Sequence, residues 1–230
     1  MAGGFVFPRR IFYNGGVGKA RALFSNATPD FREERSLGGR VAGIDEAGRG
    51  PLAGPVVAAA VLLDPKNIPD GINDSKKLTA AARRRLCAAL RTCAAIGIGQ
   101  ASVEEIDRLN VLEAALLAMR RAFSALPFVP DACLVDGNRD PRLPVPARLI
   151  VKGDCRSLSI AAASIVAKVT RDRLMADLAA EFPAYGWDKN AGYCVPFHLR
   201  ALALVGPSPH HRRSFLPVRL SLRAESLITY

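Results

Sequence analysis

Apolar residues occur along the chain in two spacings, one typical of strands and one typical of helices. Short apolar runs bounded by Gly, Pro, Asp or Asn predict strands. These runs cover residues 41–45, 55–63, 96–101, 132–136 and 147–151. Apolar residues three and four apart predict helices over 79–95, 102–127, 158–182 and 196–204. Strands that alternate with helices in this order are typical of an α/β protein with a mixed sheet.

The most regular apolar stripe begins at Ser102. Ser102 and Glu105 match the capping box, in which each side chain binds the other residue's backbone amide at the start of a helix. The stripe continues to Pro127, so we predict a single helix over residues 102–127. A second long helix is predicted over 158–182, where a run of alanines would let the helix lie close against a sheet.

Changes in composition divide the chain into three parts. Residues 1–40 begin with a basic stretch without acids that fits neither spacing, so we expect a flexible extension there. Residues 41–183 carry the alternating strands and helices of the predicted core. Residues 184–230 are basic and rich in loops, and we expect this C-terminal extension to complete a substrate groove.

The charge balance favours a polyanionic partner. The 230 residues include 32 Lys and Arg against 21 Asp and Glu, which gives a net charge of +11. Such a surface attracts nucleic acid first and an anionic membrane second. Because charge indicates partners and not fold, a basic protein without a nucleic-acid partner stays an alternative.

Cysteine content and hydropathy argue against other classes of protein. The five cysteines include no Cys-x-x-Cys pair, which argues against a disulfide scaffold and a structural zinc site. The apolar run at 55–63 is too short to cross a bilayer, which takes about 18 residues. We therefore expect a cytoplasmic monomer that contacts no membrane.

Acidic residues stand where three predicted strands end. Asp45 and Glu46 end an apolar strand and lead directly into a Gly-rich turn. Asp136 and Asp154 each follow a further strand within a turn-like sequence. Taken singly, Asp136 could form an Asx turn and Asp154 could cap a helix. The pair Asp45 and Glu46 has no such explanation, because burying two acids without a partner is unfavourable.

Four carboxylates at one edge of a sheet would repel one another unless cations neutralise them. Oxygen ligands without His or Cys select Mg²⁺ or Mn²⁺ over Zn²⁺. Two such ions about 3.5 to 4 Å apart can activate a water molecule and stabilise the departing oxygen of a phosphodiester. The four acids therefore predict a two-ion site for phosphodiester hydrolysis.

Residues 41–215 also contain a series of sequence blocks in a fixed order. The blocks are Gly43–Val56, Asp74–Leu78, Val135–Asn138, Lys152–Asp154, Ile160–Ile165, Ala167–Asp172, Tyr185–Trp187, Gly192–Tyr193, His198 and His211–Phe215. Any one block would be a weak signal, but the ordered set resembles the ribonuclease HII family, the type 2 ribonucleases H. The resemblance implies a ribonuclease H-like mixed sheet flanked by helices, with a small C-terminal extension of helices and loops.

The resemblance also implies a reaction. Asp45, Glu46, Asp136 and Asp154 would be the catalytic acids that bind two Mg²⁺ or Mn²⁺ ions. The enzyme would hydrolyse the RNA strand of RNA/DNA hybrids and cut on the 5′ side of a single ribonucleotide embedded in duplex DNA. The products would carry 3′-hydroxyl and 5′-phosphate ends, and the cellular role would be removal of ribonucleotides from DNA.

Substrate contacts are implied at further positions. Gly48, Arg49 and Gly50 would read the 2′-hydroxyl through backbone groups, and glycines let a backbone approach a sugar closely. Tyr193 would stack beneath the deoxyribose after the ribonucleotide. Phosphate contacts are expected from Ser75, Lys76, Arg212 and Arg213, where a solvated basic turn is the alternative for the last two.

Several alternatives stay open. Cys194 and Val195 replace the Gly or Pro and the Thr that usually follow Gly-Tyr in the family, which leaves the backbone beside Tyr193 in doubt. A resolvase-like nuclease that cuts only DNA could use the same superfold. A catalytically silent nucleic-acid-binding module is the third hypothesis. His198 is predicted to be a structural hydrogen-bonding residue.

Overall fold

The computed structural model describes residues 28–228 of the chain, with side chains placed as far as Leu222. The strands are β1 (Val41–Ala47), β2 (Val56–Leu63), β3 (Ala94–Ala101), β4 (Ala132–Asp136) and β5 (Ala147–Ile150). The α-helices are α1 (Arg32–Leu37), α2 (Ala80–Cys93), α3 (Val103–Leu109), α4 (Val111–Ser124), α5 (Leu158–Glu181), α6 (Trp187–Asn190), α7 (Pro196–Val205) and α8 (Leu216–Ile228), and the 3₁₀ helices are η1 (Gly153–Cys155) and η2 (Pro183–Tyr185).

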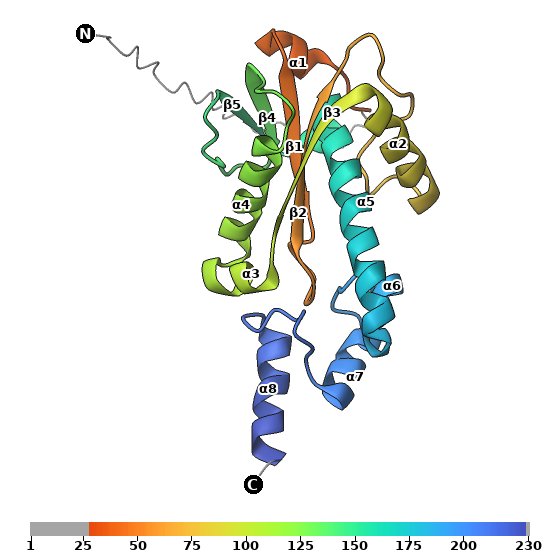
Figure 1. The fold of residues 1–230 in the computed structure, drawn as a ribbon, viewed down its shortest axis with the longest axis vertical. Coiled ribbons are helices and arrows are strands. Elements are labelled where there is room, and N and C mark those ends of the chain that lie inside the picture. Colours follow the sequence, from red (N-terminus) through yellow and green to blue (C-terminus); the bar gives the residue numbers. More distant parts are fainter. Residues whose placement is uncertain (1–27, 229–230) are drawn as a thin grey trace, which may run out of the picture.

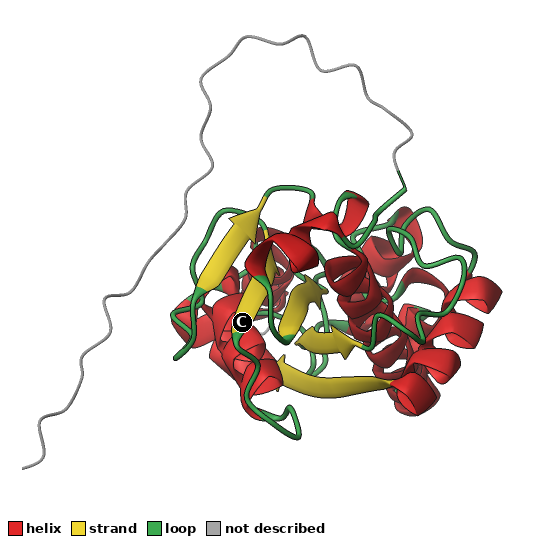
Figure 2. Ribbon diagram, turned by 90° about the horizontal axis from the view of Figure 1, so that it is seen from above, coloured by secondary structure: helices red, strands yellow, loops and turns green. Residues whose placement is uncertain are grey.

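The five strands form one mixed sheet in the order β3-β2-β1-β4-β5 (Figure 1). β1 pairs antiparallel with β2 and parallel with β4, and β4 pairs parallel with β5. Helices cover both faces of the sheet (Figure 2), with α4 against one face and α5 with α2 against the other. The predicted mixed α/β sheet is therefore confirmed. Because β1 and β4 run in the same direction, their carboxyl ends meet at one edge.

The predicted strands are all present, and the alanines of α5 are buried in the core as expected. The single helix predicted over 102–127 is wrong, because Asn110 separates α3 from α4. The capping box of Ser102 and Glu105 does begin α3. Asn110 has a φ of 72°, and its side chain accepts hydrogen bonds from the amides of Leu112 and Glu113. A second N-cap thus interrupts an apolar stripe that continues across it.

The expected boundary at residue 40 lies too late in the chain. Asp30 forms a β-bridge with Ser157, and α1 follows directly. The buried carboxylate of Glu34 accepts hydrogen bonds from Ser157 Oγ at 2.6 Å and Ser159 N at 2.8 Å, at the start of α5. Residues 30–37 therefore belong to the folded core. The flexible extension expected before them falls on residues 1–27, which lie outside the described residues.

The C-terminal part lies beyond one end of the sheet, where Figure 1 shows α7 and α8. Tyr185 and Trp187 are buried there with their stacked ring centroids 5.0 Å apart, so both side chains pack this extension. The helix α8 was not predicted. Within residues 28–228, no helix is long and apolar enough to cross a membrane.

Replacing Asn110 separates its two roles. Asn110→Ala should lower the free energy of unfolding by about 1–2 kcal/mol, because the cap is lost and a Cβ stays at positive φ. Asn110→Gly loses the same cap but tolerates that φ, so its loss should be only a few tenths of a kcal/mol. Urea unfolding of both variants measures the difference. Equal losses would show that the backbone conformation at this position is unimportant.

Candidate active site

Strand β1 places two carboxylates at the edge of the sheet. Asp45 is 6% exposed, and its Oδ1 accepts a hydrogen bond from the Glu46 amide at 2.7 Å. Glu46 Oε1 accepts from Arg49 Nη1 at 3.1 Å. Glu46 Oε2 is buried and has no hydrogen-bond partner among the described residues. A buried carboxylate oxygen without a partner is unfavourable, and a bound cation would relieve that penalty.

The next two strands supply the other two predicted acids. Ile44 of β1 is paired with Val135 of β4. The next residues, Asp45 and Asp136, therefore lie on neighbouring strands where β4 ends. Gly153 N donates to Asp136 Oδ1 at 2.7 Å and so links β4 to η1. Asp154 lies in η1 and is buried. The sheet thus brings carboxylates from three distant parts of the sequence to one edge.

Electrostatics show that these acids share one environment. Burial raises the pKa of Asp45 well above 3.8, and the charges of Glu46, Asp136 and Asp154 raise it further. The pKa of Asp136 is also raised by burial and by Glu46, and that of Asp154 by burial, Asp74 and Asp136. Without a cation, the fold therefore disfavours the charged form of each of these three aspartates.

A fifth acid, Asp74, was missed as a site residue. Asp74, Asp154 and Cys155 have possible ligand atoms within 4.8 Å of one another, and no other group of three among the described residues meets that distance. Asp74 Oδ1 accepts a hydrogen bond from Lys76 N at 2.9 Å. The predicted acids therefore interact electrostatically, but no three of them have ligand atoms within 4.8 Å of one another. The only sequence signal for Asp74 is its place directly before Ser75.

A cavity of about 290 Å³ opens beside Glu46 and Asp136. Its walls are Arg49 of the β1–β2 loop, the β4–β5 turn and the apolar side of α4. Glu46, Asp136 and Arg49 together give this cavity the charge pattern expected where a phosphodiester approaches bound cations.

The predicted sugar-reading loop is next to the predicted stacking tyrosine. A Cβ added to Gly50 would lie 3.6 Å from Tyr193 Cε1 and would touch nothing closer. Tyr193 is 44% exposed, and Arg49 and Gly50 are exposed. The amides of Arg49 and Gly50 donate to no acceptor within residues 28–222. These amides and the Tyr193 ring are therefore available to a ligand.

Lys76 and Ser75 differ in accessibility. The Lys76 side chain is 84% exposed, with Nζ 3.8 Å from Asp154 Oδ2. Burial would lower the pKa of Lys76, but the charges of Asp154, Asp74, Asp45 and Asp136 outweigh it and raise that pKa. Ser75 is buried, and its amide donates to Ser164 Oγ at 3.3 Å. Lys76 is therefore the accessible member of this pair.

The expected phosphate contact by Arg212 is wrong. Its side chain is fully buried and donates to the carbonyl oxygens of Gly48, Arg49 and Gly54. For Arg212 the solvated-turn alternative fails for the same reason. Arg213 is exposed, and its amide donates to Asp107 Oδ2 at 2.9 Å. Only Arg213 can reach a phosphate from this turn.

His198 is confirmed as a structural residue. Its ring is buried, and Nδ1 lies 2.9 Å from the carbonyl oxygen of Tyr193, so Nδ1 carries the proton. Nε2 then accepts from Trp187 Nε1 at 3.2 Å. Burial lowers the pKa of His198, which keeps the ring neutral. His198 thus holds the Tyr193 backbone in place.

Comparison with known proteins agrees with this geometry. The ribonuclease HII family model matches residues 42–218. Ribonuclease HII of Granulibacter bethesdensis is 59% identical over 208 residues, which cover 87% of this chain and 95% of that protein. Ribonuclease HII of Paramagnetospirillum magneticum is 58% identical over 194 residues, covering 83% of this chain and 96% of that protein.

A solved structure supports the same assignment. Ribonuclease H2 from Pyrococcus horikoshii OT3 is 30% identical with a TM-score of 0.68, and the match covers 83% of this chain and 100% of that chain. The match thus extends over the core and much of the C-terminal part. The chain belongs to the ribonuclease HII family and is a ribonuclease H, a divalent-metal-dependent endonuclease that acts on nucleic acid.

Proposed function

We propose that this enzyme hydrolyses the RNA strand of RNA/DNA hybrids and cuts duplex DNA on the 5′ side of a single embedded ribonucleotide. The products carry 3′-hydroxyl and 5′-phosphate ends. One observation carries the proposal. The strand with Asp45 and Glu46 leads directly into the loop that borders Tyr193, and an ion pair joins Glu46 to Arg49 of that loop. A sugar read by that loop has its phosphate beside the acids. Ribonucleotide removal from DNA is the role that this reaction would serve.

The metal sites are part of the same proposal. Asp45, Glu46, Asp136 and Asp154 would hold two ions of Mg²⁺ or Mn²⁺, because the donor set is all oxygen and Glu46 Oε2 lacks a partner. When bound, such ions lower the pKa of a water molecule and neutralise charge on the departing 3′ oxygen. Asp74 lies beside Asp154 and accepts a hydrogen bond from the Lys76 amide.

Side chains around the acids prepare the site for an anionic substrate. The Gly153 amide holds Asp136 Oδ1 and leaves the second oxygen of that carboxylate free to bind. Lys76 is exposed beside Asp154 and offers its ammonium group to a phosphate next to the cut bond. Arg49 can exchange Glu46 for a phosphate oxygen, which frees Glu46 Oε1 for a cation.

Selection of the bond to be cut rests on the loop and Tyr193. Ribose differs from deoxyribose by one hydroxyl, and the free amides of Arg49 and Gly50 are donors that such a hydroxyl can accept from. The exposed Tyr193 ring provides a flat apolar face for the neighbouring deoxyribose. Phosphate contacts by Lys76 and Arg213 add affinity without regard to sequence.

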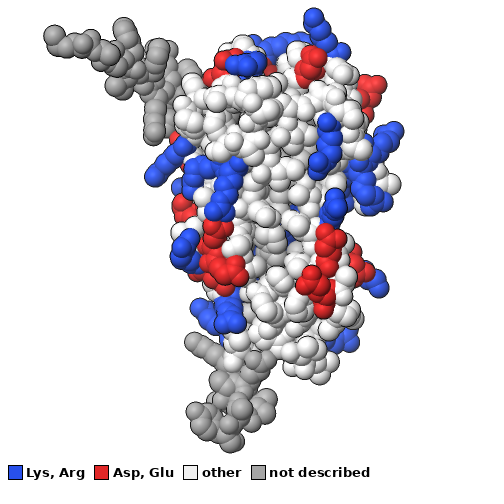
Figure 3. All heavy atoms as spheres, in the orientation of Figure 1, with Lys and Arg blue, Asp and Glu red and all other residues white. Residues whose placement is uncertain are grey.

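The surface charge fits this division between affinity and selection. Figure 3 shows Lys and Arg spread over both flanks of one face rather than gathered in a single patch. Contacts of this kind release counterions from the nucleic acid, so binding weakens as salt rises. The 2′-hydroxyl contact depends little on salt, because it involves no charge on the ligand.

Membership of the ribonuclease HII family weighs against both alternative functions, the DNA-only nuclease and the silent binding module. The retained acids and the Gly48–Gly50 loop agree with that assignment. A monomeric state and a cytoplasmic location stay predictions.

A panel of three duplexes tests the proposed substrate. The enzyme should cut a DNA duplex with one ribonucleotide and an RNA/DNA hybrid, but not an all-DNA duplex of the same sequence. Gel analysis should place the cut 5′ of the ribonucleotide, with Mg²⁺ and Mn²⁺ tested separately. Cutting of the all-DNA duplex would indicate a resolvase-like enzyme, and no cutting with any divalent ion would indicate a silent module.

Asp45→Asn tests the metal-binding acids. Cleavage should fall by at least about 100-fold, because metal-ion catalysis contributes several kcal/mol to the barrier. Binding of the labelled duplex, measured by anisotropy in EDTA, should persist because the phosphate contacts are untouched. Asp70→Asn at an exposed position is the matched control and should cut normally. An active Asp45→Asn variant would remove Asp45 from the site.

The stability of the metal-free protein gives an independent test. Because the pKa of Asp45 is raised in the folded state, protonation favours folding, and this stability is lost as pH rises through that pKa. Asp45→Asn should therefore raise the melting temperature in EDTA at pH 7. The gain should vanish as pH falls below 3.8, where Asp45 is protonated in the unfolded state as well.

Excess Mg²⁺ or Mn²⁺ should reverse this order, because the ions stabilise the native wild-type protein more than the variant. Asp70→Asn should show neither effect. A variant no more stable than wild type in EDTA would contradict the crowding of charges around Asp45.

A further inference from the structure

The carbonyl oxygens of the sugar-reading loop turn inward onto one buried guanidinium. Arg212 Nη2 donates to Gly48 O at 2.5 Å, and Nη1 donates to Arg49 O at 2.9 Å. Nε and Nη2 both donate to Gly54 O, at 3.0 and 2.8 Å. The Arg212 amide also donates to Leu52 O at 2.8 Å. One residue of the C-terminal part therefore binds both ends of the loop.

A second buried guanidinium joins this loop to the segment that carries Tyr193. Arg171 of α5 donates from Nε to Pro55 O, from Nη2 to Ala53 O and from Nη1 to Ala191 O, each at 3.0 Å. Leu52 N donates to Gly192 O at 2.8 Å alongside. Polar bonds therefore join the loop to Ala191 and Gly192, the two residues directly before Tyr193.

Neither guanidinium has a carboxylate within ion-pair distance among residues 28–222. Burial lowers the pKa of Arg171, and burial with the nearby charge of Arg171 lowers the pKa of Arg212 to about 9. Buried charges without counter-ions are unfavourable, and an apolar side chain would fill this space at less expense. The hydrogen bonds that the two guanidiniums donate to backbone carbonyl groups offset this burial.

The two glycines of the loop face different neighbours. A Cβ at Gly48, where φ is 98°, would overlap the Arg171 guanidinium. A Cβ at Gly50 would meet only the Tyr193 ring. Gly48 is therefore glycine because Arg171 packs beneath it, whereas Gly50 keeps the outer side of the loop open. Close approach to a sugar accounts for Gly50 but not for Gly48.

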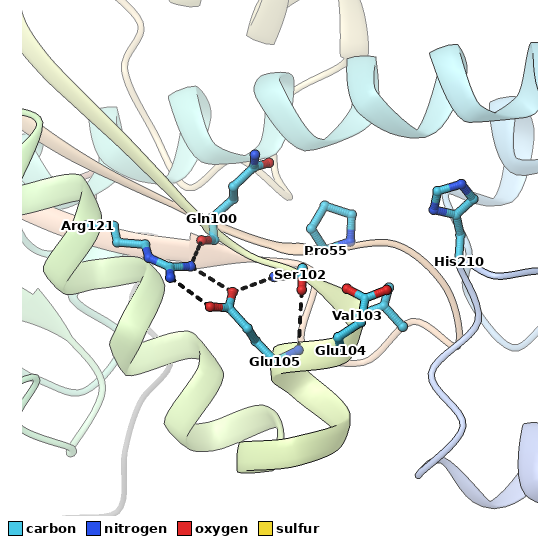
Figure 4. Close-up of a pocket in the computed structure, with 8 residues that line it drawn as sticks. All are labelled: Pro55, Gln100, Ser102, Val103, Glu104, Glu105, Arg121 and His210. Carbon is cyan, nitrogen blue, oxygen red and sulfur yellow. Dashed lines mark hydrogen bonds and ion pairs between the residues drawn. The ribbon is translucent and has the colours of Figure 1, made fainter.

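Apolar packing supports the loop at Leu52 and Ala53, but the Pro55 end of the loop borders a cavity. Figure 4 shows a cavity between the start of α3 and the C-terminal part, with Pro55 and His210 at its border. Three backbone hydrogen bonds join the loop to that part: Gly54 N to His210 O at 2.9 Å, and Leu52 N to Gly192 O and Arg212 N to Leu52 O at 2.8 Å. The two guanidiniums donate six bonds to carbonyl oxygens of the loop. The inner guanidiniums thus supply most of the bonds that define the loop's shape.

We propose that Arg171 and Arg212 are positioning residues for recognition of the ribonucleotide. By binding the loop carbonyls from inside, they leave the Arg49 and Gly50 amides pointing to the ligand side and fix the spacing between the loop and Tyr193. They touch no substrate themselves. This inference rests on the proposed function, in which the loop and Tyr193 act together at a junction between ribonucleotide and deoxyribonucleotide.

Lysine substitutions test the role, because lysine keeps the charge but cannot reach several carbonyls at once. In Arg212→Lys and Arg171→Lys, kcat/KM for the duplex with one ribonucleotide should fall by about 10- to 100-fold, the size of effect expected from misplaced binding groups. The value for a long hybrid should fall less, because hybrid cutting needs no junction. The Mg²⁺ concentration for half-maximal activity should stay unchanged. Arg173→Lys, at an exposed position of α5, is the matched control.

Amide hydrogen exchange gives a readout that needs no activity. In the lysine variants, exchange should accelerate at the hydrogen-bonded amides of Leu52 and Gly54 and at residues 191–193, and should stay as in wild type at β4 and α4. This result would stand even if the wild-type enzyme failed to cut the junction duplex, so failure of the proposed function and failure of this inference can be told apart.

Three outcomes would overturn the inference. The first is an equal loss on both substrates that follows the melting temperature, and the second is unchanged exchange in the loop of a folded variant. The third concerns Arg212→Gln, which keeps one amide donor and provides a second variant. If that variant and both lysine variants fail to fold, the two arginines serve the fold as a whole and not the loop.

Discussion

Burial of like charges is the constraint on which this enzyme depends. Asp45 is almost fully buried beside three other acids, and burial together with the charges of those acids raises its pKa. The apolar sheet and its helices hold these acids in place although they destabilise the metal-free fold. A site of this kind binds cations strongly because the unfavourable term disappears when they bind. The metal-free fold holds these acids at one edge of the sheet at a cost in stability that bound cations would offset.

The β1–β2 loop lies between the acidic pocket and two buried guanidiniums that have no carboxylate partner among residues 28–222. Asp45 and Glu46 precede the loop, and Arg171 and Arg212 lie behind it. Peptide dipoles orient in such a field, with carbonyls toward the guanidiniums and amides away from them. The loop consequently offers donors on the side where a sugar hydroxyl or phosphate oxygen would arrive. Neither charged group needs to touch the other for this polarity to arise.

Local patterns in the sequence predicted most of the secondary structure, because strand and helix periodicity depends on near neighbours. The break at Asn110 was missed because the apolar stripe runs through it without a Gly or Pro. The helix α1 was missed because Glu34, which anchors it, contacts Ser157 at the start of α5, 123 residues further along the chain. Contacts of that range leave no periodic signal in the sequence.

The candidate site shows the same limit. Strand ends predicted that Asp45, Asp136 and Asp154 would meet, since parallel strands bring their carboxyl ends to one edge. Asp74 follows no strand, and only the folded chain places it against Asp154. Arginine at a basic turn is ordinarily a surface residue. The burial of Arg212 could not be predicted because its partners are backbone carbonyls, which every sequence possesses and no side-chain pattern reveals.

Under the proposed function, cleavage of the phosphodiester and selection of the sugar depend on two different parts of the molecule. The acids depend on β1, β4 and η1, which belong to the sheet and its edge. The shape of the β1–β2 loop depends on Arg212 and Arg171, and His198 holds the Tyr193 backbone. Under the proposed function, a change in the C-terminal part would alter which sugar is accepted while the acids keep their geometry. Polar bonds to the backbone carry this coupling together with the packing of Leu52 and Ala53, while Pro55 at the end of the loop borders a cavity.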